Sequence, residues 1–130
     1  MPYQDSVYLN IPVRDLEKSI KFYTAIGFTQ NKTFSTPEGA MMSWTRNNEA
    51  TTISYMLLTH PFYQTFLPPG IERVDPTRAA QIITCLSSSG REELDSTVEK
   101  AKAQGAKVDI REKTEIEKQM AASMGMYSRM

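Results

Sequence analysis

The chain has 130 residues and a mass of 14.7 kDa, which fits one compact domain with a single hydrophobic core. Fifteen basic and fifteen acidic side chains cancel at pH 7, so no net field attracts nucleic acid. Its apolar runs are too short to span a bilayer, and its one cysteine, Cys85, cannot form an internal disulfide. We therefore expect a cytoplasmic protein that binds neither nucleic acid nor membrane.

The first predicted element is a strand from Val7 to Val13 with one aliphatic face. Its odd positions are aliphatic, whereas Tyr8 and Asn10 face the other way, because side chains alternate along a strand. Asp15 then supplies the N-cap of a helix with a periodic apolar stripe, which Gly27 ends. The aliphatic strand face and the helical stripe are expected to bury each other.

Two further strands are predicted in the first half of the chain. They run from Ala40 to Arg46 and from Thr51 to Thr59, and residues 47–50 form the hairpin turn between them. The stretch 61–78 is rich in proline, which disfavours regular structure, so we expect an irregular linker there.

The second half of the chain repeats the order strand, helix, glycine, strand. A strand from Ala80 to Ser87 precedes a helix from about Arg91 to Gln104. Gly105 then leads into a strand from Lys107 to Glu112. Because a glycine ends the helix in both halves, the pattern favours an internal duplication over two unrelated strand-helix-strand units.

The run from Val7 to Phe28, VYLNIPVRDLEKSIKFYTAIGF, resembles the opening of the vicinal oxygen chelate superfamily. That superfamily includes glyoxalase I, bleomycin-resistance proteins, fosfomycin-resistance enzymes and extradiol dioxygenases. The strand, the Val-x-Asp-Leu-Glu-x-Ser step and the Phe-Tyr before Gly-Phe are all in register, and residues 82–108 resemble the repeat more loosely. The phrases Asn-Ile-Pro-Val and Met-Leu-Leu-Thr are most similar to bacterial proteins described as lactoylglutathione lyase-like.

The resemblance implies an α+β fold in which two βαβββ modules form a curved mixed sheet. This sheet is a cup, with the helices outside and a small-molecule ligand inside. The modules would be residues 7–60 and 79–130, joined by 61–78, and paired modules in this superfamily commonly meet across a homodimer. The last strand of the second module, which carries a Glu ligand in the metalloenzymes, would follow Met130.

Strand alternation, combined with this resemblance, predicts the side chains that line the cup. The amide of Asn10 can donate to and accept from a ligand, or it can pair with neighbouring backbone. Arg129 can bind an anionic substrate, or it can be an ordinary solvated arginine. The predicted ligand-binding residues are Tyr8, Asn10, Tyr55, Leu57, Ile83, Cys85 and Arg129.

Metalloenzymes of the superfamily hold a divalent ion with His, Gln or Glu on three strands, and the matching positions are Tyr8, Leu57 and Ile83. Leu and Ile have no lone pair and a neutral Tyr is a poor donor, so no metal cofactor is expected. His60, the single histidine, is expected at the surface or at a pocket rim. Cys85 is expected to be packed and inert, because no basic neighbour would favour its thiolate.

These observations favour a small-molecule-binding protein that works without a metal ion. Two alternatives stay open. One is a lactoylglutathione lyase-like lyase or isomerase that takes the ligands of a zinc or nickel ion from other residues. The other is a homodimer with a vestigial pocket.

Overall fold

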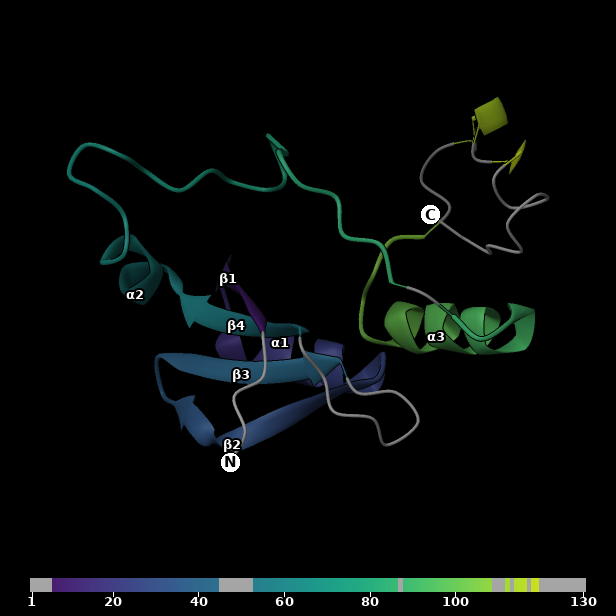
Figure 1. The fold of residues 1–130 in the computed structure, drawn as a ribbon, viewed down its shortest axis with the longest axis horizontal. Helices are drawn as coiled ribbons and strands as arrows, with labels where there is room; N and C mark the ends of the chain where they lie inside the picture. The colour runs from purple at the N-terminus through teal and green to yellow at the C-terminus, as the bar shows by residue number, and fades with distance from the viewer. Residues whose placement is uncertain are drawn as a thin grey trace. The chain divides into compact units, whose positions relative to one another are not determined.

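The computed structural model describes residues 6–44, 53–86 and 88–108, together with positions 112, 114–116 and 118–119. The chain divides into two compact units, Met1–Ala80 and Gln81–Met130. The first unit contains a sheet with two helices, and the second contains helix α3 (Arg91–Ala103) (Figure 1).

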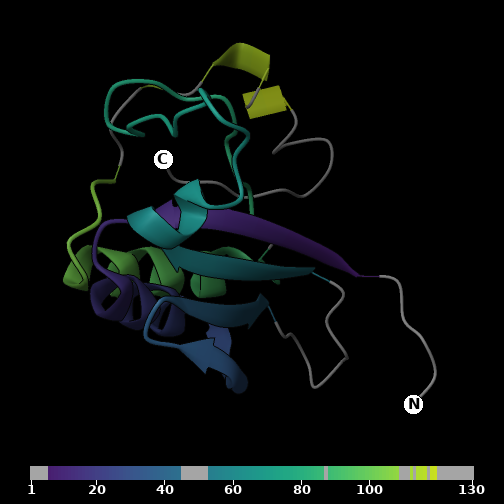
Figure 2. The same ribbon diagram turned by 90° about the vertical axis from the view of Figure 1, so that its left-hand side faces the viewer.

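The sheet of the first unit has four strands, which are β1 (Val7–Val13), β2 (Phe28–Thr36), β3 (Gly39–Trp44) and β4 (Ile53–Thr59). Their spatial order is β1-β4-β3-β2, which can be followed by colour in Figure 2. β1 pairs in parallel with β4, and the other neighbours are antiparallel. With a helix after β1, the element order is that of the first predicted βαβββ module.

Helix α1 (Leu16–Ala25) begins and ends where the sequence predicts. One carboxylate oxygen of Asp15 accepts a hydrogen bond of 3.1 Å from the backbone N–H of Lys18, and this satisfies a donor that the first turn would otherwise leave unpaired. After the helix, Gly27 has a φ of 119°, a left-handed conformation that favours glycine.

The pairing register assigns each strand side chain to one face of the sheet, because residues paired across neighbouring strands point the same way. One face packs against α1, and we call it the helix face. There the Tyr23 ring of α1 lies 5.2 Å from the Phe28 ring and 5.6 Å from the Tyr55 ring, centroid to centroid. The strand side chains of the helix face include Leu9, Ile11, Phe28, Ala40, Met42, Tyr55 and Leu57.

A short helix, α2 (His60–Gln64), begins directly after β4, so the prediction of an irregular linker from residue 61 is wrong for its first residues. Pro61 fits here because the first turn of a helix needs no N–H donor from it. The ring of Phe62 in α2 lies near Gly39 and Leu58, on the face opposite α1. Residues 65–78 form turns and irregular backbone, as predicted.

Helix α3 agrees with the prediction, with Val98 buried and Gly105 at a φ of 94° beyond its end. The predicted strand from Ala80 to Ser87 is wrong over residues 80–86, which pair with no strand in the described ranges. Ile82 and Ile83 are 78% and 75% exposed there, so their β-forming side chains have no sheet to pack on.

The second βαβββ module is therefore not observed in the part of the chain that the structure describes, and one module is seen. Of the predicted strand Lys107–Glu112, positions 107, 108 and 112 are not in a strand, and 109–111 lie outside the described residues. The hairpin turn predicted at 47–50 also lies outside them. Within the described ranges, no helix combines the length and the hydropathy that crossing a bilayer requires.

Candidate functional site

The face of the sheet opposite α1 is the first candidate ligand surface, and we call it the open face. Tyr8 on β1 pairs with Ser54 on β4, and Asn10 pairs with Met56, so these four side chains share one side. On β3, Met41 and Ser43 pair with Met56 and Ser54, and on β2, Asn31 and Thr29 pair in turn with Met41 and Ser43. Among the described residues of the first unit, α2 lies against the end of this face near Leu58.

The open face combines apolar side chains with hydrogen-bonding groups. The Tyr8 side chain is 55% exposed, Asn10 is exposed, and Met41 and Met56 are half-buried. At the centre, the hydroxyl oxygens of Ser43 and Ser54 lie 3.1 Å apart and form a hydrogen bond. Adaptable thioethers beside an amide and hydroxyls suit a small organic molecule better than a bare ion.

Tyr8 and Asn10 point away from α1, as the alternation along β1 predicts. Their contact with a ligand stays a prediction. Two amides lie on the open face, those of Asn10 and Asn31. Asn10 is exposed and accessible to solvent and solutes, whereas Asn31 is half-buried and its Oδ1 accepts a hydrogen bond from the backbone N–H of Thr33.

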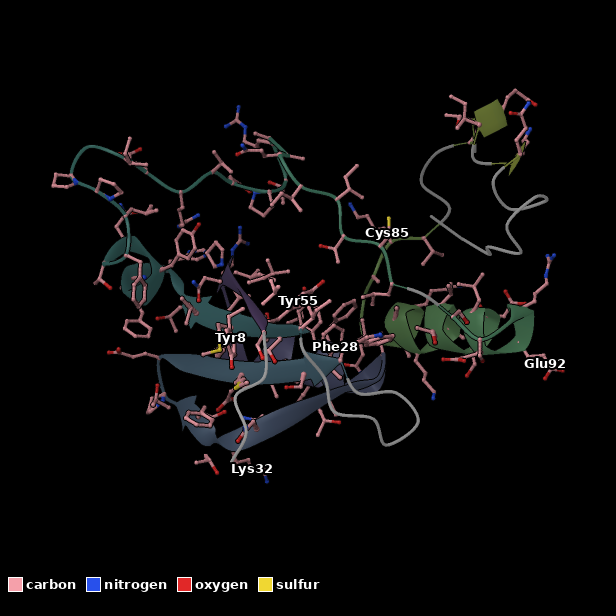
Figure 3. The ribbon with its side chains drawn as sticks, viewed as in Figure 1. Tyr8, Phe28, Lys32, Tyr55, Cys85 and Glu92 are labelled. Carbon is pink, nitrogen blue, oxygen red and sulfur yellow. The ribbon has the colours of Figure 1, made fainter. Side chains whose placement is uncertain are left out.

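The predicted orientation is wrong for Tyr55 and Leu57, which belong to the helix face. Leu57 pairs with Ile11 and Ala40 and has no exposed surface. Tyr55 is buried against the rings of Tyr23 and Phe28, and Figure 3 shows it next to Phe28. The positions of β4 that face away from α1 are instead Ser54 and Met56.

The three positions matched to metal ligands do not form one wall, because Tyr8 and Leu57 lie on opposite faces of the sheet. Ile83 belongs to the second unit and stands on irregular backbone. Across the described residues, no group of three or more His, Cys, Asp or Glu side chains is placed to hold a metal ion.

Cys85 is also in the second unit, and its side chain is exposed, so the prediction that it is packed is wrong. The predicted strand would have buried it, but no neighbouring strand covers residues 80–86 in the described ranges. Arg129 lies outside the described residues.

A pocket of about 680 Å³ lies in the first unit, where β1 ends and α1 begins. We call it the basic pocket, because most of its charged side chains are cationic. It is an open pocket, lined by the end of β1, the first turn of α1, the start of α2 and the loop at residues 73–77. The charged and titratable side chains in its wall are Arg14, Asp15, Lys18, His60, Arg73 and Asp75.

The titration of two of these groups reflects their surroundings. Desolvation lowers the pKa of His60 below its ordinary value, and the charges of Arg73 and Arg14 lower it further, although Asp75 acts in the opposite direction. Hydrogen bonds from the hydroxyl and backbone N–H of Thr77 lower the pKa of Asp75. His60 lies at a pocket, as predicted. The pocket itself could not be predicted from the alternation of residues along the strands, because a loop forms one of its walls.

Comparison with known proteins gives two similarities. Residues 6–44 match a family model described as "Bleomycin resistance protein-like N-terminal". A solved structure of a hypothetical protein from S. aureus is 25% identical, with a TM-score of 0.63, and the likeness covers 87% of this chain and 78% of that one. No curated protein gives a significant match. The segment that forms β1, α1, β2 and β3 is therefore similar to the N-terminal part of bleomycin resistance protein-like proteins.

Proposed function

We propose that this chain is a small-molecule-binding protein of the bleomycin-resistance type, which holds an apolar or aromatic compound against its open face. The observation that carries the proposal is the make-up of that face, whose side chains on β1, β2 and β3 belong to the segment with bleomycin-resistance likeness. Tyr8 offers an exposed ring for stacking, and Met41 and Met56 offer flexible apolar contacts. Asn10 supplies hydrogen bonds that orient the compound.

Binding is favoured over a lyase or isomerase reaction by the chemistry of the same side chains. The open face carries a phenol, two amides, two thioethers and three aliphatic hydroxyls. A proton transfer next to a carbonyl needs a positioned base, which is usually an imidazole or a carboxylate. None of these side chains is an imidazole or a carboxylate, so their chemistry favours recognition without chemical change.

The test is a thermal-shift screen with bleomycin, glutathione conjugates and aromatic drugs. A compound that binds only the native state raises the melting temperature by mass action. We expect at least one compound to do so, and Asn10→Leu to remove most of the shift because it deletes both hydrogen-bonding atoms of the amide.

Thr24→Leu is the matched control, because it also places a leucine at an exposed polar position, but on α1. It should leave the shift unchanged. If Asn10→Leu binds the compound as well as wild type does, the open face is not the binding surface. If no compound shifts the wild-type protein, the binding function itself is contradicted.

A further inference from the structure

The basic pocket brings together three permanent cations from two separate parts of the chain. Arg14 follows β1, Lys18 lies in the first turn of α1, and Arg73 lies in the loop that follows α2. The residues that line the pocket all belong to the first unit, and Tyr8 and Asn10 of the open face are not among them.

The two carboxylates in the wall are held by local hydrogen bonds and offset the three cations only in part, although the charges of Arg14 and Arg73 contribute to lowering the pKa of Asp75. Asp15 caps α1 through the N–H of Lys18 at 3.1 Å. Asp75 accepts 2.9 Å and 2.7 Å hydrogen bonds from the N–H and hydroxyl of Thr77. Among the described residues, Arg14, Lys18 and Arg73 form no ion pair with a carboxylate.

From this arrangement we propose that the basic pocket binds a small organic oxyanion through Arg14, Lys18 and Arg73. A guanidinium binds phosphate or carboxylate oxygens in a bidentate manner, and an ammonium adds a mobile point charge. The first turn of α1 adds the positive end of the helix dipole to the same wall. The volume of about 680 Å³ exceeds what a bare ion fills and suits an anion with an organic body.

His60 makes this binding depend on pH. The groups that face its imidazole are Arg14 and Arg73, which disfavour the protonated form, and Asp75, which favours it. Asp15 and Lys18 of α1 complete the charged wall. A bound anion offsets the two arginines and raises the pKa of His60, so protonation and anion binding reinforce each other. The affinity should therefore rise as the pH falls through the range in which His60 titrates.

The experiment measures the binding of phenyl phosphate to the full chain by isothermal titration calorimetry at constant ionic strength, with inorganic phosphate as a second probe. We expect phenyl phosphate to bind more tightly than inorganic phosphate, because the pocket has room for the ring. Arg73→Gln should weaken binding on the order of tenfold or more, which is typical of one charge-assisted hydrogen-bond pair.

Lys32→Gln is the control, because Lys32 is an exposed cation on β2 outside the pocket, and its loss changes the net charge equally. Equal affinities of Arg73→Gln and Lys32→Gln would overturn the proposal, as would a wild-type protein that binds neither probe. If Arg73→Gln does not fold, as judged by circular dichroism, Arg14→Gln takes its place with the same expectation.

Two further variants separate the role of the imidazole from that of the open face. At pH values below 6.5, the ordinary pKa of an imidazole, wild type should gain more affinity for phenyl phosphate on further acidification than His60→Gln does. An equal pH dependence of the two proteins would contradict the role of the imidazole. Asn10→Leu alters the open face and should leave phenyl phosphate binding intact. The proposed anion site in the basic pocket is therefore tested separately from the proposed function of the open face.

Discussion

Leu57 and Tyr8 show how strongly the two faces of the sheet differ for a single side chain. Leu57 is fully buried among Ile11, Ala40 and their neighbours, and such interiors are packed as densely as organic crystals. Tyr8 keeps 55% of its surface exposed. Truncation of the first side chain leaves a cavity, whereas truncation of the second mainly removes a contact surface for a ligand.

We expect Leu57→Ala to lower the free energy of unfolding by about 2–5 kcal/mol, the range for a large-to-small change in a core. Tyr8→Ala should change it by about 0.5 kcal/mol or less, as exposed substitutions usually do. Urea denaturation followed by circular dichroism measures both. Similar losses of stability in the two variants would mean that the assignment of faces is wrong.

The same two residues show what the sequence could predict about the site. Along β1 the aliphatic residues Val7, Leu9 and Ile11 alternate with polar or aromatic ones, so the pattern itself reveals which side faces the core. Residues 55–58 of β4 are Tyr, Met, Leu and Leu, which are apolar on both faces. β4 is a central strand with neighbours on both sides. The alternation of polar and apolar residues is weak in such strands, so the sequence could not show which face of the sheet Tyr55 and Leu57 point to.

At the scale of elements, the helices were predictable where capping chemistry marks their ends. Asp15 and Gly27 bound α1, and Gly105 follows α3, because caps depend on a few local residues. β2 was not predicted from its own pattern, because its residues are largely polar and its pairing with β3 is irregular between Asn31 and Thr36. α2 is too short to show the hydrophobic periodicity by which a helix is recognised in a sequence.

Asp15 both caps α1 and lies in the wall of the basic pocket, so its substitution should change both the stability of the protein and the binding of an anion. Asp15→Ala should lower the free energy of unfolding by about 1 kcal/mol through loss of the cap, whereas Asp15→Asn keeps an acceptor and should cost little. Both remove a negative charge from the pocket wall, so both should tighten phenyl phosphate binding. Urea denaturation and calorimetry on the same samples check the two effects. Weaker binding in Asp15→Asn would contradict the electrostatic account of the pocket.

At the scale of the whole molecule, the first unit is the βαβββ module that the sequence predicts, and the described part of the second unit contributes helix α3. A predicted strand such as 80–87 depends on partner strands that lie elsewhere in the chain, so its local pattern could not establish a second sheet. The homodimer implied by the resemblance stays a prediction.

The central claim is that the ligand lies against the side of the sheet that α1 does not cover. The most direct measurement is a nuclear magnetic resonance titration of isotope-labelled protein with the compound that gives the largest thermal shift. We predict that the largest changes fall on the side-chain amide of Asn10 and the methyl groups of Met41 and Met56, while the methyl groups of Leu57 change little. Changes concentrated at Leu57 and other side chains of the helix face, or confined to the second unit, would contradict the account.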